Sequence, residues 1–193
     1  MISRRVALML GAVLLLVLAA WAVSRGFARL TGVRPEADPV VAETSSPPTA
    51  IRHINVTLFS GSKDGETLVP HQQEVVLAEG LVPQGREILS AQLERPMPPR
   101  VPVIPEGTTL RAFYVTDRGD AFVDLSAEVS SRHLGGSSAE LLTVYAVVNA
   151  VTANLPTIRR VQILIDGREA DTLAGHIDLR NPLERDASIV SKP

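Results

Sequence analysis

The sequence predicts an α+β domain, with two helices on one face of a mixed or largely antiparallel sheet, behind an N-terminal transmembrane helix. Two observations predict the domain: several segments alternate apolar and polar residues as strands do, and two segments carry apolar residues at helical spacing. An uncharged apolar run at residues 6–23 predicts the membrane span. The chain has 193 residues, 45% of them hydrophobic, so we expect one globular domain with accessory segments.

The run at residues 6–23 would form a helix about 27 Å long, close to the hydrocarbon thickness of a bilayer. Arg4 and Arg5 precede it, which favours a cytoplasmic location for residues 1–5. A cleaved signal peptide is the alternative, because Ala20-Trp21-Ala22 fits a cleavage site. We expect the domain outside the cytoplasmic membrane, or secreted or periplasmic if the run is cleaved. The absence of cysteine excludes disulfides, thiol catalysis and lipid attachment through an N-terminal cysteine.

Residues 24–50 are rich in proline and serine and lack an amphipathic period, which predicts a linker. The domain then occupies residues 51–183, and residues 184–193 are expected to be a disordered tail. Its elements begin with strands at residues 53–60 and 73–79 and a helix at 84–95.

The prolines between residues 96 and 105 end that first helix and predict an extended passage. Strands at 109–116 and 121–126 follow, joined by a hairpin turn. The clearest helix lies within residues 135–156, where Ser137 and Glu140 match a capping box. The last elements are a strand at 159–166 and a return strand from 168, joined by a tight turn.

The stretch from 166 to 179 holds most of the residues that could form a site. Asp166 and Gly167 are predicted as turn residues with positive φ. Residues 175–179 alternate with period two, so we expect a strand that begins at Gly175 and places His176 and Asp178 on one face. Such a pair could serve a hydrolase, but Ser126 and Ser137 lie in no nucleophile motif.

We therefore predict that His176 has a hydrogen-bonding role at a sheet edge, and that the chain has no catalytic residues. The four histidines form no H-x-x-x-H or H-x-H pair, and no metal site or cofactor is predicted. Asn149 falls on the apolar face of the long helix, where its amide must bond either to backbone or to a ligand. We expect the backbone bond.

The charge balance excludes one class of partner and leaves two open. A net charge of −2 without a basic patch argues against nucleic-acid binding. A cell-wall glycan could bind through Asn149, His176 and Asp178, although only 4% of residues are aromatic and could stack on sugar rings. The remaining class is protein: an envelope partner or a second copy of the chain.

The sequence "YAVVNAVTANLPTIRRVQILIDGREADTLAGHIDLRNPL", residues 145–183, resembles the C-terminal half of GerMN domains, the module of sporulation and spore germination proteins. The blocks "VTLFSGSKDGETLVPHQQEV", "IPEGTTLRAFYV" and "GDAFVDLSAEV" resemble earlier parts of that family in the same order. The resemblance implies an extracytoplasmic α+β module that mediates protein assembly, with no defined catalytic residues. It makes the expected function a membrane-anchored interaction module in cell-envelope assembly or a sporulation- or germination-like process.

Overall fold

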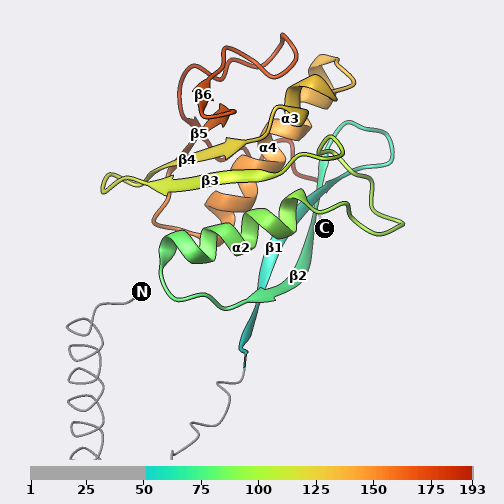
Figure 1. Cartoon of the computed structure of the whole chain (residues 1–193). Helices are drawn as coiled ribbons and strands as arrows, with labels where there is room; N and C mark the ends of the chain where they lie inside the picture. Colours follow the sequence, from blue (N-terminus) through green and yellow to red (C-terminus); the bar gives the residue numbers. More distant parts are fainter. Residues whose placement is uncertain (1–50, 193) are drawn as a thin grey trace, which may run out of the picture. The chain divides into compact units, whose positions relative to one another are not determined.

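The computed structural model describes residues 51–192 (Figure 1). The predicted cytoplasmic N-terminus (1–5), membrane span (6–23) and linker (24–50) lie outside the described residues. No helix within residues 51–192 combines the length and the apolar character that a membrane span requires. The described elements are, in chain order, β1 (His53–Gly61), β2 (Leu68–Val76), α2 (Leu81–Leu93), β3 (Leu110–Val115), β4 (Asp120–Leu125), α3 (Glu128–Ser131), α4 (Ser137–Asn154), β5 (Arg160–Ile165), β6 (Arg168–Glu169) and β7 (Leu183–Glu184).

The strands form two separate sheets. One sheet has five strands in the order β3-β4-β5-β6, with β7 also pairing with β5, and it is mixed because β4 and β5 run parallel. The helix α4 makes the crossover between those two strands. β1 and β2 form a two-stranded antiparallel ribbon of their own. The predicted α+β class and mixed sheet are confirmed, but the expectation that all strands join a single sheet is wrong.

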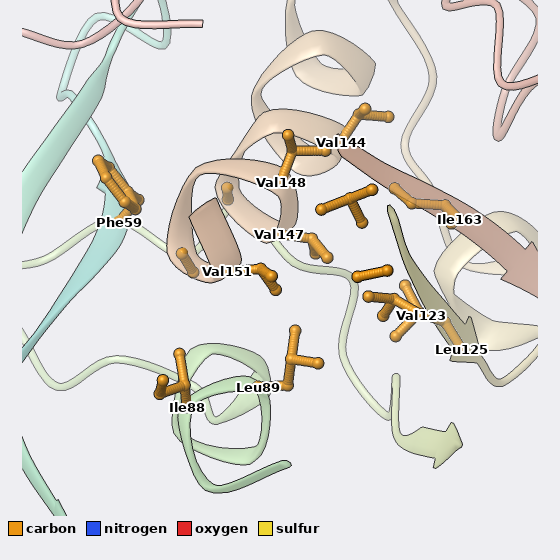
Figure 2. Packing of buried hydrophobic residues seen from close by; sticks show 14 of the residues in the cluster. Phe59, Ile88, Leu89, Val123, Leu125, Val144, Val147, Val148, Val151 and Ile163 are labelled. Carbon is orange, nitrogen blue, oxygen red and sulfur yellow. The ribbon is translucent and has the colours of Figure 1, made fainter. Parts of the chain in front are cut away.

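The two long helices lie between the ribbon and the sheet (Figure 1). α2 packs against β3 and the ribbon, while α4 packs against α2, β1 and β5. Figure 2 shows Val144, Val147, Val148 and Val151 of α4 with β1 on one side and the sheet on the other. α4 is buried around most of its circumference rather than along one apolar stripe, because it has packed neighbours on several sides.

The core combines apolar residues from all of these layers (Figure 2). Full burial of a large aliphatic or aromatic side chain contributes about 1.5–3 kcal/mol. In α2, Gly85 lets the helix approach Phe113 of β3, since a Cβ there would lie 2.2 Å from the aromatic ring. The core side chains labelled in the close-up are Phe59, Ile88, Leu89, Val123, Leu125, Val144, Val147, Val148, Val151 and Ile163.

Two element boundaries differ from the prediction for physical reasons. β2 covers residues 68–76 rather than 73–79, because it pairs with β1 along its whole length and tolerates Pro70. Pro70 lies opposite Phe59, whose N–H points away from β2 and donates to Gln92 instead. The two strands therefore form no hydrogen bond at this pair of residues, and the missing N–H of Pro70 costs the ribbon none. α2 begins at Leu81, upstream of the predicted residue 84, because Pro83 lies in its first turn.

The turn between β5 and β6 has the predicted conformation. Asp166 and Gly167 have φ values of 50° and 75°, and Ile165 pairs with Arg168 across the turn. The Gly167 N–H donates to Asp124 Oδ1 at 2.7 Å, which fixes the turn to the neighbouring strand. The strand predicted at residues 175–179 is wrong, because this segment is a loop in which Gly175 has a φ of 98°.

The segment after Leu183 is held against the domain and is not a disordered tail as predicted. β7 pairs with β5, and further along Val190 forms a bridge with Leu68 of β2. The Leu68 N–H donates to the Ile189 carbonyl at 2.8 Å, and the Ser191 N–H donates to the Leu68 carbonyl at 2.8 Å. One end of the outer edge of β2 is therefore covered by the C-terminal segment.

Replacing the turn glycine should destabilise the fold. Gly167→Val places a β-branched residue at a φ of 75°, which should lower the free energy of unfolding by about 1–3 kcal/mol. Arg168→Val is the matched control, because it puts the same side chain on an exposed strand residue one position later. Thermal unfolding of both variants makes the measurement. An unchanged melting temperature for Gly167→Val would contradict the turn assignment.

Candidate functional site

A buried carboxylate organises the stretch in which the sequence placed most candidate residues. Glu140, in the first turn of α4, is fully buried. Its Oε1 accepts hydrogen bonds from the N–H groups of Leu173 at 2.8 Å and Ala174 at 2.9 Å. Its Oε2 accepts from the His176 N–H at 2.8 Å and lies 3.1 Å from His176 Nδ1. The loop at residues 171–179 is thus wrapped around one side chain.

These donors keep Glu140 ionised. Burial by itself would raise the pKa of Glu140, but the backbone hydrogen bonds from Ala174 and His176 and the His176 ring favour the charged form. The net result is a pKa below the usual value for glutamate. A buried carboxylate with several donors is a structural anchor, because removing either side leaves polar groups unsatisfied.

The capping box predicted from Ser137 and Glu140 is wrong. α4 begins after Gly136, and no side chain caps its N-terminus. The sequence did not identify Glu140 as the partner of His176, because Glu140 matched the capping-box pattern and so already had a predicted role. A signal was present: Glu140 lies on the same helical stripe as Val144, Val147 and Val151, which are buried. A carboxylate on a buried stripe must find donors.

His176 and Asp178 do not form a pair. The His176 side chain, 43% exposed, faces Glu140, whereas Asp178 forms an ion pair with Arg180 at 2.7 Å. Hydrogen bonding from the Arg180 side chain lowers the pKa of Asp178 to about 2. The hydrolase that would use His176 and Asp178 together has no support in this geometry. Residues 51–192 also contain no group of three side chains suited to hold a metal ion.

Asn149 is fully buried and bonds to backbone. Its Nδ2 donates to the Asp186 carbonyl at 2.7 Å, and its Oδ1 accepts from the Asp186 N–H at 3.1 Å. Asp166 lies at the surface, 3.4 Å from Arg111 in an ion pair. A glycan would therefore find Asn149, His176 and Asp178 already engaged with other protein groups.

Three further helix amides bond to backbone in the same manner. Gln92 donates to the Phe59 carbonyl at 2.8 Å and accepts from the Phe59 N–H at 2.9 Å. Asn154 makes the equivalent pair with Thr57, both at 2.8 Å. Gln84 accepts from the Ala78 N–H at 2.9 Å and donates to the Val76 carbonyl at 3.3 Å. These contacts attach the ribbon to the helices.

A cleft of about 960 Å³ opens between the ribbon, the C-terminal end of α2, the proline-rich passage 96–107 and the first turns of α4. Two hydrogen bonds fix the passage as one wall. The Val101 carbonyl accepts from the Gly61 N–H at 2.8 Å, and the Val103 carbonyl accepts from Thr143 Oγ1 at 2.6 Å. The sequence predicted the extended passage but assigned it no role.

The cleft has an apolar interior and an exposed apolar rim. Leu58 and Phe59 of β1 and Leu142 of α4 contribute to its lining. At its rim Met97 is 74% exposed and Leu134 is 100% exposed. A preformed, largely apolar concavity with a few polar groups is typical of binding sites in proteins. This cleft is the candidate interaction site of the domain.

The comparisons with known proteins identify the family. Residues 57–171 match the Germane family, which is described as sporulation and spore germination. The chain belongs to this family. No curated protein shows significant similarity to the sequence. The predicted resemblance to GerMN domains is thereby confirmed.

Two solved structures share the fold. The first GerMN domain of the sporulation protein GerM from Bacillus subtilis is 18% identical with a TM-score of 0.50, and the match covers 69% of this chain and 96% of that chain. The tandem GerMN domains of the same protein give 18% identity and a TM-score of 0.50, covering 71% of this chain and 46% of that chain. The Germane domain described here is thus similar in fold to one GerMN repeat.

Removing the buried carboxylate should destabilise the domain more than removing its histidine partner. In Glu140→Gln, the side-chain amide presents either its N–H₂ group or a single acceptor oxygen to several backbone N–H donors. The substitution should lower the free energy of unfolding, measured in urea, by about 2–4 kcal/mol. His176→Ala loses one half-exposed contact and should cost about 0.5–1.5 kcal/mol. Equal losses for the two variants would contradict the central position of Glu140.

The contribution of Glu140 should disappear in acid. Its pKa is lower in the folded protein than in the unfolded chain, so protonation favours unfolding. The stabilisation is complete above the unfolded glutamate pKa of about 4.3 and declines as the pH falls through the lower folded value. The difference in unfolding free energy between the wild type and E140Q should therefore shrink below that range. A constant difference between neutral and strongly acidic pH would be inconsistent with an ionised Glu140.

Proposed function

We propose that residues 51–183 form a non-catalytic interaction module outside the cytoplasmic membrane, held there by residues 6–23. Its setting would be cell-envelope assembly or a sporulation- or germination-like process, with an envelope protein or a second copy of the chain as partner. Membership of the Germane family supports the setting. The apolar run and the basic residues before it support the anchor.

The observation that carries the interaction role is the cleft. Its wall is fixed by hydrogen bonds to β1 and α4, so a partner would meet a preformed surface and little ordering entropy would be lost on binding. The exposed side chains of Met97 and Leu134 supply apolar area at its rim. His176 and Glu140, a pair of side chains typical of catalytic sites, contact each other to hold the loop at residues 171–179 instead.

The location follows from the anchor and can be tested in cells. The full chain with a C-terminal epitope should sediment with membranes and resist extraction with alkaline carbonate. Protease added to intact spheroplasts should remove the epitope, whereas a cytoplasmic marker in the same cells should survive. Two charges in the apolar run, in the double variant Leu14→Arg/Leu16→Arg, should abolish membrane retention, because each arginine at the centre of a span costs about 2.5–3.5 kcal/mol.

Recovery of the intact, epitope-tagged chain in the cytosol would refute this location. Release of the domain into the medium or periplasm, with loss of the first residues, would show that the run is a cleaved signal peptide. The domain would then still act outside the cytoplasm, but without its own anchor.

A further inference from the structure

We propose that His133 is a pH-sensitive switch that holds the loop between α3 and α4, and that protonation of its ring releases this loop at the rim of the cleft. The inference goes beyond the proposed function, because it depends neither on the location of the domain nor on the identity of a partner. It is carried by the hydrogen bonds of the two ring nitrogens and by the contacts of the loop.

Both ring nitrogens of His133 are engaged by protein groups. His133 follows α3, and its half-buried side chain contacts α4. Its Nδ1 accepts a hydrogen bond from the Gly135 N–H at 2.9 Å, and its Nε2 lies 3.1 Å from Thr143 Oγ1. Thr143 donates its single hydroxyl hydrogen to backbone, to the Val103 carbonyl at 2.6 Å or the Ala139 carbonyl at 3.0 Å. Nε2 is therefore the donor to Thr143, and the neutral ring carries its proton there.

A protonated ring is incompatible with this arrangement. Imidazole is the side chain that changes its charge between about pH 5 and 8, and its charged form has an N–H on both nitrogens. The Nδ1–H of a charged His133 would point at the Gly135 N–H, so that two donors would face each other across the 2.9 Å between the nitrogens. Either the ring or the Gly135 peptide must then turn away, and the hydrogen bond is lost.

No neighbouring charge compensates a protonated His133. Within residues 51–192 the ring forms no ion pair. Beside it, Glu128 and Arg132 of α3 and its C-terminal end lie against Gly107, and Glu140 of α4 accepts from the loop at residues 171–179. The other titratable and charged side chains that line the cleft with His133 are His71, Glu94, Arg95, Arg100 and Glu106. With Arg132, the lining thus has three arginines and two glutamates, a balance that does not favour a further positive charge.

The hydrogen bond to His133 attaches the loop to the domain. Among the N–H groups of residues 134–136, that of Gly135 alone has a partner in the described part of the chain. Leu134 is 100% exposed, and Gly135 and Gly136, with φ values of 81° and 91°, have no side chain that could pack. Loss of this one bond therefore frees the loop that joins α3 to α4 (Figure 1).

Release of the loop changes the rim of the cleft. His133 and Leu134 both line the cleft, and Thr143, which contacts His133, binds the Val103 carbonyl of the opposite wall. The rim is therefore ordered where His133 is neutral and mobile where it is charged. A partner that contacts Leu134 would lose more ordering entropy on binding in acid, so its affinity would decline as the pH falls.

NMR spectroscopy of the isotope-labelled full chain in detergent micelles tests the switch. At about pH 8 a scalar coupling across the N–H···N hydrogen bond should connect the Gly135 amide nitrogen with His133 Nδ1. On titration to about pH 5 the coupling should vanish with the same midpoint as protonation of the His133 ring. The amide order parameters of Leu134 and Gly135 should fall over the same range, from the value of about 0.85 typical of rigid backbone to below about 0.6.

Three variants assign the transition to His133. His133→Asn is the matched variant that does not titrate, because its Oδ1 takes the place of Nδ1 and accepts from the N–H two residues later. Its loop should stay rigid over the whole titration, whereas the loop of His133→Ala should be mobile throughout. His176→Ala should retain the wild-type transition, since His176 contacts the Glu140 carboxylate and its protonation strengthens that contact. The wild-type titration needs no substitution, so the test stands even where a variant does not fold.

A Gly135 coupling or a rigid loop that persists after His133 is protonated would overturn the proposal. A loop that is already mobile at about pH 8, a ring that stays neutral at about pH 5, or an acid-induced release in His133→Asn would also overturn it. These results are independent of the membrane fractionation, so a failure here is distinct from a failure of the proposed function.

Discussion

Side chains on the two long helices bond to backbone groups that no neighbouring strand satisfies. Gln92 and Asn154 each make a two-bond contact with alternate residues of β1, where an adjacent strand would otherwise pair. Gln84 and Asn149 do the same for the end of β2 and for the C-terminal segment. The backbone of a buried strand edge must be paired, and these amides accomplish this without a further strand.

Glu140 extends the same principle to a loop. Its carboxylate replaces a strand partner for the N–H groups of Leu173, Ala174 and His176, so that the loop needs no regular structure of its own. The ribbon, the loop and the C-terminal segment are all attached to the helices in this way. The helix pair is thus the layer to which the rest of the domain is attached. The proline-rich wall of the cleft is fixed to this layer by its hydrogen bonds to β1 and α4.

Much of the fold was predictable because it depends on local patterns. The period-two alternation at residues 53–60 and 159–166 and the turn chemistry of Asp166-Gly167 are local signals, and each element is present. The separation of the ribbon was not predictable, since Gln92 and Phe59 are 33 residues apart and an amide on a helix gives no sign of its partner. For the same reason Glu140 could be interpreted as a cap, and residues 175–179 as a strand.

Amide hydrogen exchange of the Gln92→Leu variant tests this account most directly. The Phe59 N–H, which donates to Gln92, should exchange at least tenfold faster than in the wild type. The adjacent Leu58 N–H lies on the side of β1 that faces β2, and its exchange should be little changed. Ser90→Ala, on the exposed face of α2, should alter neither amide. Unchanged protection of Phe59 in Gln92→Leu, or an equal increase at Phe59 and Leu58, would contradict the claim that helix side chains stand in for missing strands.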